Sequence, residues 1–214
     1  MIYKILWVDT ETTGLDHREN AMVRLGGLVD VGGFVVDEFD LKFAPFCGAV
    51  IEPAALAVNG LKVDEIQGYP PAAESLAAFG ATIGQHIDLA DPQDRFVLAG
   101  FSVAFDWGFI RSTWRRSLPD DSQGLKAFVF GCPLDVQFLL ARQILDGLRL
   151  DSYSLVCACR HFGVALETAH DALSDIRATR ALYRRLLHHR PRFRPPAPRY
   201  DDVFFEGLDL LAQC

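Results

Sequence analysis

Two acidic residues, Asp9 and Glu11, stand two positions apart where an apolar strand gives way to a Thr-Thr-Gly-Leu turn. Side chains at i and i+2 of a strand point to the same side, whereas in a helix they would diverge. Two carboxylates held side by side repel each other, and a divalent cation would relieve that repulsion. The segment is therefore interpreted as half of a metal site whose other ligands lie elsewhere in the chain.

Two later segments supply acidic residues that can complete this site. Asp106 follows an apolar strand and falls in the first turn of a predicted helix, over the sheet edge where open α/β folds gather their ligands. His170 and Asp175 would diverge within a helix, but they can converge if a helix begins near Asp171. Each segment alone is typical of solvated surface, and the order of all three favours a shared site.

The remaining patterns predict the elements that must position these residues. Gly32-Gly33 joins two β-rich runs tightly, so those strands must be antiparallel. Strands are expected over 2–8, 22–31, 34–43 and 95–99, and helices within 53–66 and over 72–89, 105–116, 134–148, 154–162 and 172–189. This order predicts an α/β fold with a mixed sheet and helices packed on its faces.

Composition limits the function classes and the number of domains. The 214 residues suit one α/β domain, and a hydrophobic content of 50% excludes a disordered chain. The net charge of −7 does not by itself indicate nucleic acid, although arginines crowd the C-terminal quarter. We expect one folded domain over 1–189, then a Pro/Arg-rich linker and a short apolar tail over 190–214, because the prolines cannot continue the last helix.

The cysteines and the apolar runs indicate a cytoplasmic protein. Five scattered cysteines argue against a disulfide framework and for a reducing compartment, and Cys157-Ala-Cys159 lacks the second pair that a zinc knuckle needs. The chain opens directly on strand material, so we expect no signal peptide. The longest apolar run, over 21–36, is interrupted by charges and glycines, and we therefore expect no membrane span.

These motifs resemble those of the DEDDh, or DnaQ-like, exonucleases, the family of the proofreading subunit of bacterial DNA polymerase III, ribonuclease T and oligoribonuclease. The first family motif matches at Asp9-Thr10-Glu11-Thr12-Thr13-Gly14-Leu15, the second at Phe105-Asp106 and the third at His170 and Asp175. Ala57-Val58-Asn59-Gly60-Leu61 resembles the segment that the family places between its motifs. The resemblance covers roughly residues 1–187 and leaves the tail outside, so it implies that the domain over 1–189 is an exonuclease domain.

The resemblance implies a fold, an activity and a set of roles. The fold would be ribonuclease H-like, with a mixed five-stranded sheet that has one antiparallel strand and helices on both faces. The activity would be 3′→5′ release of nucleoside monophosphates from single-stranded ends. By analogy, His170 activates the attacking water and two divalent cations are held by Asp9, Glu11, Asp106 and Asp175. Hard carboxylate oxygens suit Mg²⁺ or Mn²⁺ better than zinc.

The substrate contacts are expected around the first motif. Thr10, Thr12, Thr13 and Gly14 are assigned to the 3′ end, and Leu15 and Phe105 to packing against terminal bases, with a core aromatic as the alternative for Phe105. Many relatives carry His at the position of Asn59 and Asn at that of Ser102. Both residues can still form hydrogen bonds, so these two substitutions bear on substrate preference rather than on the chemistry.

Three functional hypotheses remain open from the sequence. The first is an exonuclease on single-stranded DNA, of the proofreading or repair type. The second is an RNA 3′-end trimmer resembling ribonuclease T or oligoribonuclease, working as a homodimer, in which the C-terminal arginines would hold the RNA backbone unless they are simply a solvated helix face. The third is a replication-associated subunit docked through residues 203–211, unless that tail packs on its own domain or a dimer mate.

Overall fold

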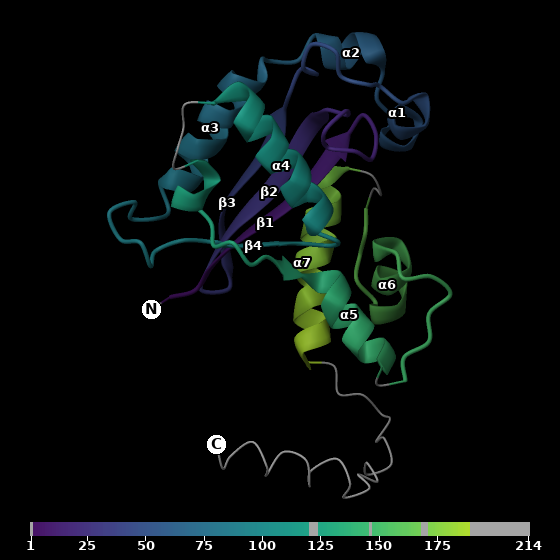
Figure 1. The fold of residues 1–214 in the computed structure, drawn as a ribbon. Coiled ribbons are helices and arrows are strands. Elements are labelled where there is room, and N and C mark those ends of the chain that lie inside the picture. The colour runs from purple at the N-terminus through teal and green to yellow at the C-terminus, as the bar shows by residue number, and fades with distance from the viewer. Residues whose placement is uncertain (1, 120–123, 146, 168–170, 189–214) are drawn as a thin grey trace, which may run out of the picture.

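The computed structural model describes residues 2–119, 124–145, 147–167 and 171–188. Its centre is a five-stranded sheet in the order β3-β2-β1-β4-β5 (Figure 1). The strands are β1 (Lys4–Thr12), β2 (Met22–Val31), β3 (Phe34–Lys42), β4 (Val97–Gly100) and β5 (Leu134–Asp135). β2 runs antiparallel to both of its neighbours, whereas β1, β4 and β5 pair in parallel. The expected mixed sheet with one antiparallel strand is therefore confirmed.

The alternation of side chains along β1 builds a separate hydrophobic layer on each face of the sheet. Leu6 and Val8 point to the face covered by α3 and α4, and Ile5 and Trp7 to the face covered by α5, α6 and α7 (Figure 1). These helices are α3 (Ala72–Gly84), α4 (Ala104–Ser117), α5 (Val136–Leu145), α6 (Leu155–Phe162) and α7 (Ala172–His188). β1 is thus buried on both sides, which makes it a rigid support for residues at its end.

Two short helices close the end of the sheet where β1 stops, and a 3₁₀ turn packs beside α4. The short helices α1 (Pro53–Asn59) and α2 (Val63–Gln67) pack Leu56 and Ile66 against Ala21 and Val23 at the start of β2. A 3₁₀ turn, η1 (Gly124–Ala127), lies against α4 through Leu125. Among the described residues, no helix combines the length and the apolar character that a membrane crossing needs.

The structure differs from the sequence prediction at several element boundaries, of which three are the largest or bear on the site. Leu134 and Asp135 pair with Ala99 and Gly100 as β5, although they were expected to begin a helix. A strand of two residues has no periodicity that a sequence pattern can reveal. β1 continues to Thr12, beyond its expected end at residue 8, and α3 ends at residue 84 instead of 89.

Candidate active site

The two carboxylates of the first motif lie within a regular part of β1. Asp9 and Glu11 continue the face of Ile5 and Trp7, which is the face covered by α7, and they stand opposite Gly26 and Arg24 of β2. Gly26 lets the helix approach, because a Cβ atom on it would lie 2.8 Å from the Cβ atom of Ala172. The first turn of α7 therefore rests on the sheet beside the two acids.

The two acids of the later motifs reach this point from opposite sides of the sheet. Asp175 lies in the first turn of α7, as the sequence predicted for a helix that begins near Asp171. Asp106 lies in the first turn of α4 and is buried. Its Oδ1 accepts hydrogen bonds from the backbone nitrogen of Thr10 at 2.9 Å and from the Thr10 hydroxyl at 2.7 Å. Thr10 thus ties α4 to β1 between Asp9 and Glu11.

The electrostatics of these groups show that the four carboxylates influence one another. Burial raises the pKa of Asp9 well above its usual range, and the charges of Asp106, Asp175 and Glu11 raise it further. Burial, followed by the charge of Asp175, raises the pKa of Glu11 to about 8, although Arg24 partly opposes this. Burial also raises the pKa of Asp106 to about 7 against the two hydrogen bonds from Thr10. Without a cation, the cluster therefore retains protons at neutral pH.

This donor set suits a hard divalent cation in its chemistry. All four groups are carboxylates, and a cation would offset the repulsion that raises the pKa values of Asp9 and Glu11. The side chains are in electrostatic range rather than in coordination geometry, since no three His, Cys, Asp or Glu side chains of the described ranges are placed to hold one ion. His170, the predicted base, lies outside the described residues.

In the Thr-Thr-Gly turn after β1, the threonine hydroxyls form hydrogen bonds within the protein. Thr12 donates its hydroxyl hydrogen to the carbonyl oxygen of Gly14 at 2.7 Å, and buried Thr13 donates its own to the carbonyl oxygen of Val50 at 2.7 Å. Gly14 has no room for a side chain, because a Cβ atom there would lie 2.4 Å or less from the side chain of Asn20. The space left by the missing side chain of Gly14 is therefore filled by Asn20 in this structure.

The other predicted substrate residues lie around the same edge of the sheet. Asn59 donates from Nδ2 to the carbonyl oxygen of Thr12 at 3.0 Å, which joins the end of α1 to the first motif. Leu15 is 80% exposed beside the turn, free to meet a ligand. Phe105 is only partly buried, and its ring lies 4.9 Å from that of Phe109 on the core side of α4. Ser102 has a φ angle of 60°, a left-handed conformation in the turn that leads into α4.

Sequence reasoning missed two residues that shape this site. Asp135, buried at the end of β5, accepts hydrogen bonds at Oδ1 from the backbone nitrogens of Ser102 at 3.0 Å and Gln137 at 2.9 Å. Its charge also contributes to the raised pKa of Asp106. The second is Arg24, whose side chain joins Asp40 of β3 to Asp171 before α7. Neither role could be found without the pairing of β5 and the register between β1, β2 and β3.

Comparison with known proteins places this arrangement in a family. The sequence profile described as Exonuclease, RNase_T, matches residues 6–183. The chain is 27% identical over 171 residues to a PolC-type DNA polymerase III of Clostridium perfringens, which is 80% of this chain and 10% of that protein. It is 28% identical over 185 residues to ribonuclease T of Shewanella frigidimarina, which is 82% of this chain and 78% of that one.

Solved structures show the same fold in a larger protein. A zinc-bound complex of Escherichia coli exonuclease I with single-stranded DNA superimposes with a TM-score of 0.66 at 18% identity, over 99% of this chain and 45% of that one. The chain thus spans about a tenth of the PolC-type relatives and less than half of exonuclease I. The ribonuclease H-like α/β fold predicted from the sequence is confirmed. With the family profile matching most of its length, the chain belongs to the DnaQ-like family of 3′→5′ exonucleases.

Proposed function

We propose that this chain is a divalent-cation-dependent 3′→5′ exonuclease that releases nucleoside monophosphates from single-stranded DNA ends. The observation that carries the proposal is the convergence of four carboxylates from β1, α4 and α7. Burial raises the pKa values of Asp9, Glu11 and Asp106, and the charges of the other acids raise those of Asp9 and Glu11 further. Such a cluster is costly to keep without a cation. A cation-dependent phosphodiesterase accounts for why these groups are held together.

In this proposal Asp9, Glu11, Asp106 and Asp175 hold two Mg²⁺ or Mn²⁺ ions. When bound, such ions activate the attacking water and stabilise the attacking and leaving oxygens of an in-line displacement. Both hydrogen bonds from Thr10 go to Oδ1 of Asp106, which fixes this carboxylate and leaves Oδ2 for ligation. Glu11 and Asp106 must lose their protons to become ligands, so cation affinity should rise with pH up to about 8.

His170 has the proposed role of general base. An imidazole has an unperturbed pKa of about 6.5, which suits removal of a proton from water near neutral pH. Its position in the sequence, directly before Asp171, supports this role because Asp171 lies at the start of the helix that carries Asp175. Leu15, at the exposed edge of the turn, is proposed to pack against the terminal base, and Asn59 and Ser102 to set the preference for the end of the strand.

The substrate is proposed to be DNA, with RNA as the second candidate. Similarity to PolC-type DNA polymerases and the fold of exonuclease I, solved with single-stranded DNA, favour DNA. Similarity to ribonuclease T favours RNA trimming, since the chain matches 78% of that protein's length but only 10% of the polymerase's.

Exposed arginines on and beside α4 support contacts with a nucleic-acid backbone. Arg18, Arg111 and Arg115 are exposed, and in the described ranges none of them forms an ion pair with an Asp or Glu. The Arg111 guanidinium lies over the ring of Trp107, 5.6 Å from its centroid. A cationic and aromatic surface on the helix that carries Asp106 suits a single strand.

Several arginines of α7, which the sequence suggested for the same purpose, have other partners. Arg177 pairs with Glu38 at 2.8 Å, Arg180 pairs with Asp30 at 2.7 Å, and Arg184 donates to the carbonyl oxygen of Gly33 at 2.8 Å. These contacts fasten α7 to β2, β3 and the hairpin between them. The arginines beyond residue 189 lie outside the described residues.

The tail hypotheses stay predictions for the same reason. Residues 203–211, proposed to dock a replication protein or a second copy of the chain, lie outside the described residues, as does the boundary between 1–189 and 190–214. A cytoplasmic location remains part of the proposal. It is supported by free thiols at Cys47, Cys132, Cys157 and Cys159.

A time course on matched DNA and RNA oligomers of one sequence, labelled at the 5′ end, tests direction and substrate together. We expect a ladder that shortens from the 3′ end, with DNA degraded faster and a 3′-terminal phosphate slowing the first step. Asp175→Asn serves as the inactive control. Faster degradation of RNA would favour the second candidate, and cleavage at internal positions would refute an exonuclease.

A further inference from the structure

The side chain of Arg24 links three elements next to the carboxylate cluster. We propose that Arg24 is a positioning residue that fastens the start of α7, and with it Asp175, to the sheet beside Glu11. This inference deepens the proposed exonuclease function and rests on it for its kinetic consequences. The structural part of the inference, the fastening itself, can be tested without any substrate.

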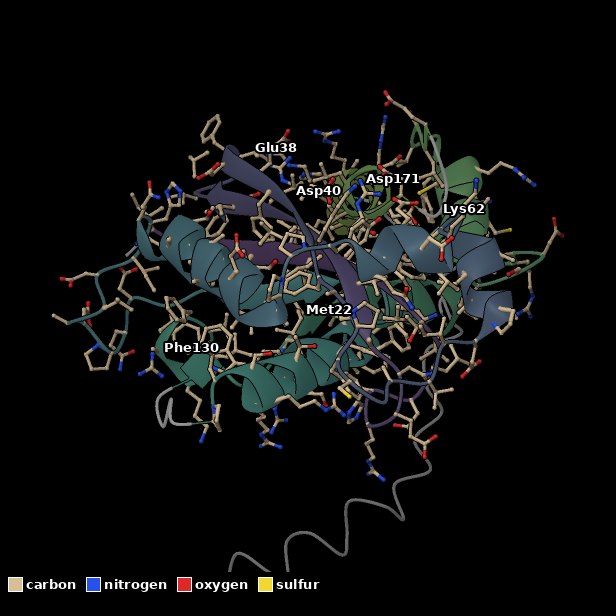
Figure 2. All side chains as sticks on the ribbon, turned by 90° about the horizontal axis from the view of Figure 1, so that it is seen from above. Met22, Glu38, Asp40, Lys62, Phe130 and Asp171 are labelled. Atoms are coloured by element: carbon tan, nitrogen blue, oxygen red, sulfur yellow. The ribbon has the colours of Figure 1, made fainter. Side chains whose placement is uncertain are left out.

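The geometry of Arg24 places its three nitrogens on two carboxylates. Arg24 stands opposite Glu11 in the register of β1 and β2. Its Nε and Nη2 atoms each lie 2.6 Å from an oxygen of Asp40 on β3, and its Nη1 atom lies 2.7 Å from Oδ1 of Asp171. Asp40 and Asp171, the two residues that this guanidinium joins, are labelled in Figure 2. Asp40 holds the guanidinium flat on the sheet, and the remaining nitrogen reaches the helix.

Asp171 connects the guanidinium of Arg24 to the first turn of α7. Its Oδ2 accepts a hydrogen bond from the backbone nitrogen of Ser174 at 3.0 Å, and its carbonyl oxygen accepts one from the backbone nitrogen of Asp175 at 2.9 Å. Asp171 is therefore the N-cap of α7, with one carboxylate oxygen on the helix and the other on Arg24. Moving Arg24 would release the cap and the turn that presents Asp175.

Other described contacts fasten α7 to the sheet at positions other than its N-cap. The packing of Ala172 on Gly26 sets how close the helix lies to β2, but an apolar contact leaves rotation about the helix axis less restricted. The ion pair of Arg177 with Glu38 lies further along the helix, and both of its side chains are about half exposed, at 51% and 50%. Arg24 and Asp171 are more covered, at 21% and 32%. The ion pair of Arg180 with Asp30 is more covered still, at 15% and 5%, but Arg180 lies roughly two and a half turns beyond Asp171 and therefore holds a later part of the helix.

The residue type also fits the role. A guanidinium has a rigid fork that can bind one carboxylate with two nitrogens and a second with the third, whereas an ammonium is a point charge on a flexible stem. The positive charge of Arg24 also opposes the rise in the pKa of Glu11. Lysine would keep this charge and lose the fork, so it separates the electrostatic contribution of Arg24 from its positioning role.

The test compares Arg24→Gln and Arg24→Lys with Arg177→Gln, which removes an ion pair between the same helix and the same edge strand. On single-stranded DNA with Mn²⁺, we expect Arg24→Gln to lower kcat by about 10- to 100-fold, the effect of misplacing a catalytic group. KM should change less than about threefold, because the substrate surface is intact. Arg24→Lys should recover only part of the loss, and Arg177→Gln should retain the wild-type kcat.

Amide hydrogen exchange of the metal-free protein gives a second result that does not depend on activity. We expect the backbone amide hydrogen of Ser174 to exchange about tenfold faster in Arg24→Gln, as for local opening of one helix turn. Its exchange rate should be unchanged in Arg177→Gln. Asp171→Asn keeps a capping side chain and loses the ionic contact, so it replaces Arg24→Gln if that variant does not fold. A protein that carries both Arg24→Gln and Asp171→Asn should lose no more activity than either single variant, because both substitutions remove the same contact.

Two outcomes would overturn the inference. One is a kcat of Arg24→Gln within about twofold of the wild type, or equal to that of Arg177→Gln. The other is unchanged exchange at Ser174 in both Arg24→Gln and Asp171→Asn. An inactive wild-type protein would refute the proposed function instead, and the exchange measurement would still decide whether Arg24 fastens α7.

Discussion

Replacing Glu11 by glutamine should stabilise the metal-free protein, and increasingly so as pH rises. Burial and the charge of Asp175 raise the pKa of Glu11 from 4.5 to about 8, so the folded state keeps a proton that the unfolded chain has lost. Between these pH values the folded state binds more protons, and its free energy of unfolding falls as pH rises. The contribution of protonated Glu11 is complete below about pH 4.5 and is lost as pH rises through about 8.

The size of this effect follows from the same pKa values. One pKa unit corresponds to about 1.4 kcal/mol, so between pH 5 and pH 8 the wild type loses up to about 4 kcal/mol that Glu11→Gln retains. The charges of Asp175, Asp171 and Asp106 also act on Glu11, which spreads its titration over a wider pH range, so the loss should be at least about 1 kcal/mol. Urea unfolding in EDTA at several pH values measures this difference.

The control for this experiment is Glu19→Gln, at an exposed position after the turn, which should parallel the wild type at every pH. Saturating Mn²⁺ should reverse the order of Glu11→Gln and wild type at pH 8, because a cation binds the ionised carboxylate and stabilises the folded state. A stability difference between Glu11→Gln and wild type that stays constant within about 0.5 kcal/mol from pH 5 to pH 8 would refute the electrostatic account of this cluster.

Three further variants test separate parts of the structure. Arg111→Gln combined with Arg115→Gln should weaken binding of single-stranded DNA and reduce the slope of log K against log salt by about 1 to 2, as measured by fluorescence anisotropy; an unchanged slope would exclude both residues from phosphate contact. Asp135→Ala should lower the free energy of unfolding by about 1 to 3 kcal/mol, because two backbone nitrogens lose their acceptor, and a melting temperature equal to that of the wild type would contradict this. Gly26→Ala should cost about 1 to 3 kcal/mol because the new methyl group overlaps Ala172, and a stabilised variant would show that α7 can move away.

The sequence predicted the β2–β3 hairpin well, and it placed four acids at one edge of the sheet, for identifiable physical reasons. β2 and β3 were expected at almost their observed bounds, because apolar runs flanking two glycines define a hairpin locally. Asp9, Glu11, Asp106 and Asp175 were grouped because each follows or opens an element at one edge of an α/β sheet.

The contacts that set the geometry of the site were not accessible from sequence patterns. The link from Arg24 to Asp40 and Asp171 depends on strand register and on where α7 docks, and these are tertiary properties. The role of Asp135 could not be predicted, because the sequence pattern indicates a helix from residue 134 where the structure has a two-residue strand. The partners of Arg177 on β3 could not be told from a solvated helix face, because both interpretations need only an exposed arginine.

The dependence of nucleotide release on the carboxylate cluster and a divalent cation can be tested directly. The measurement is the rate at which wild type and Asp9→Asn release mononucleotides from a 3′-labelled single-stranded DNA, first in EDTA and then in Mn²⁺. Asp9 has the carboxyl group whose pKa is raised by all three of the other acids, so its removal should disable the cluster as a whole. We expect release by the wild type only in Mn²⁺, and loss of about 1000-fold or more of that rate in a folded Asp9→Asn protein. Equal rates for the two proteins, or release by the wild type in EDTA, would contradict this expectation.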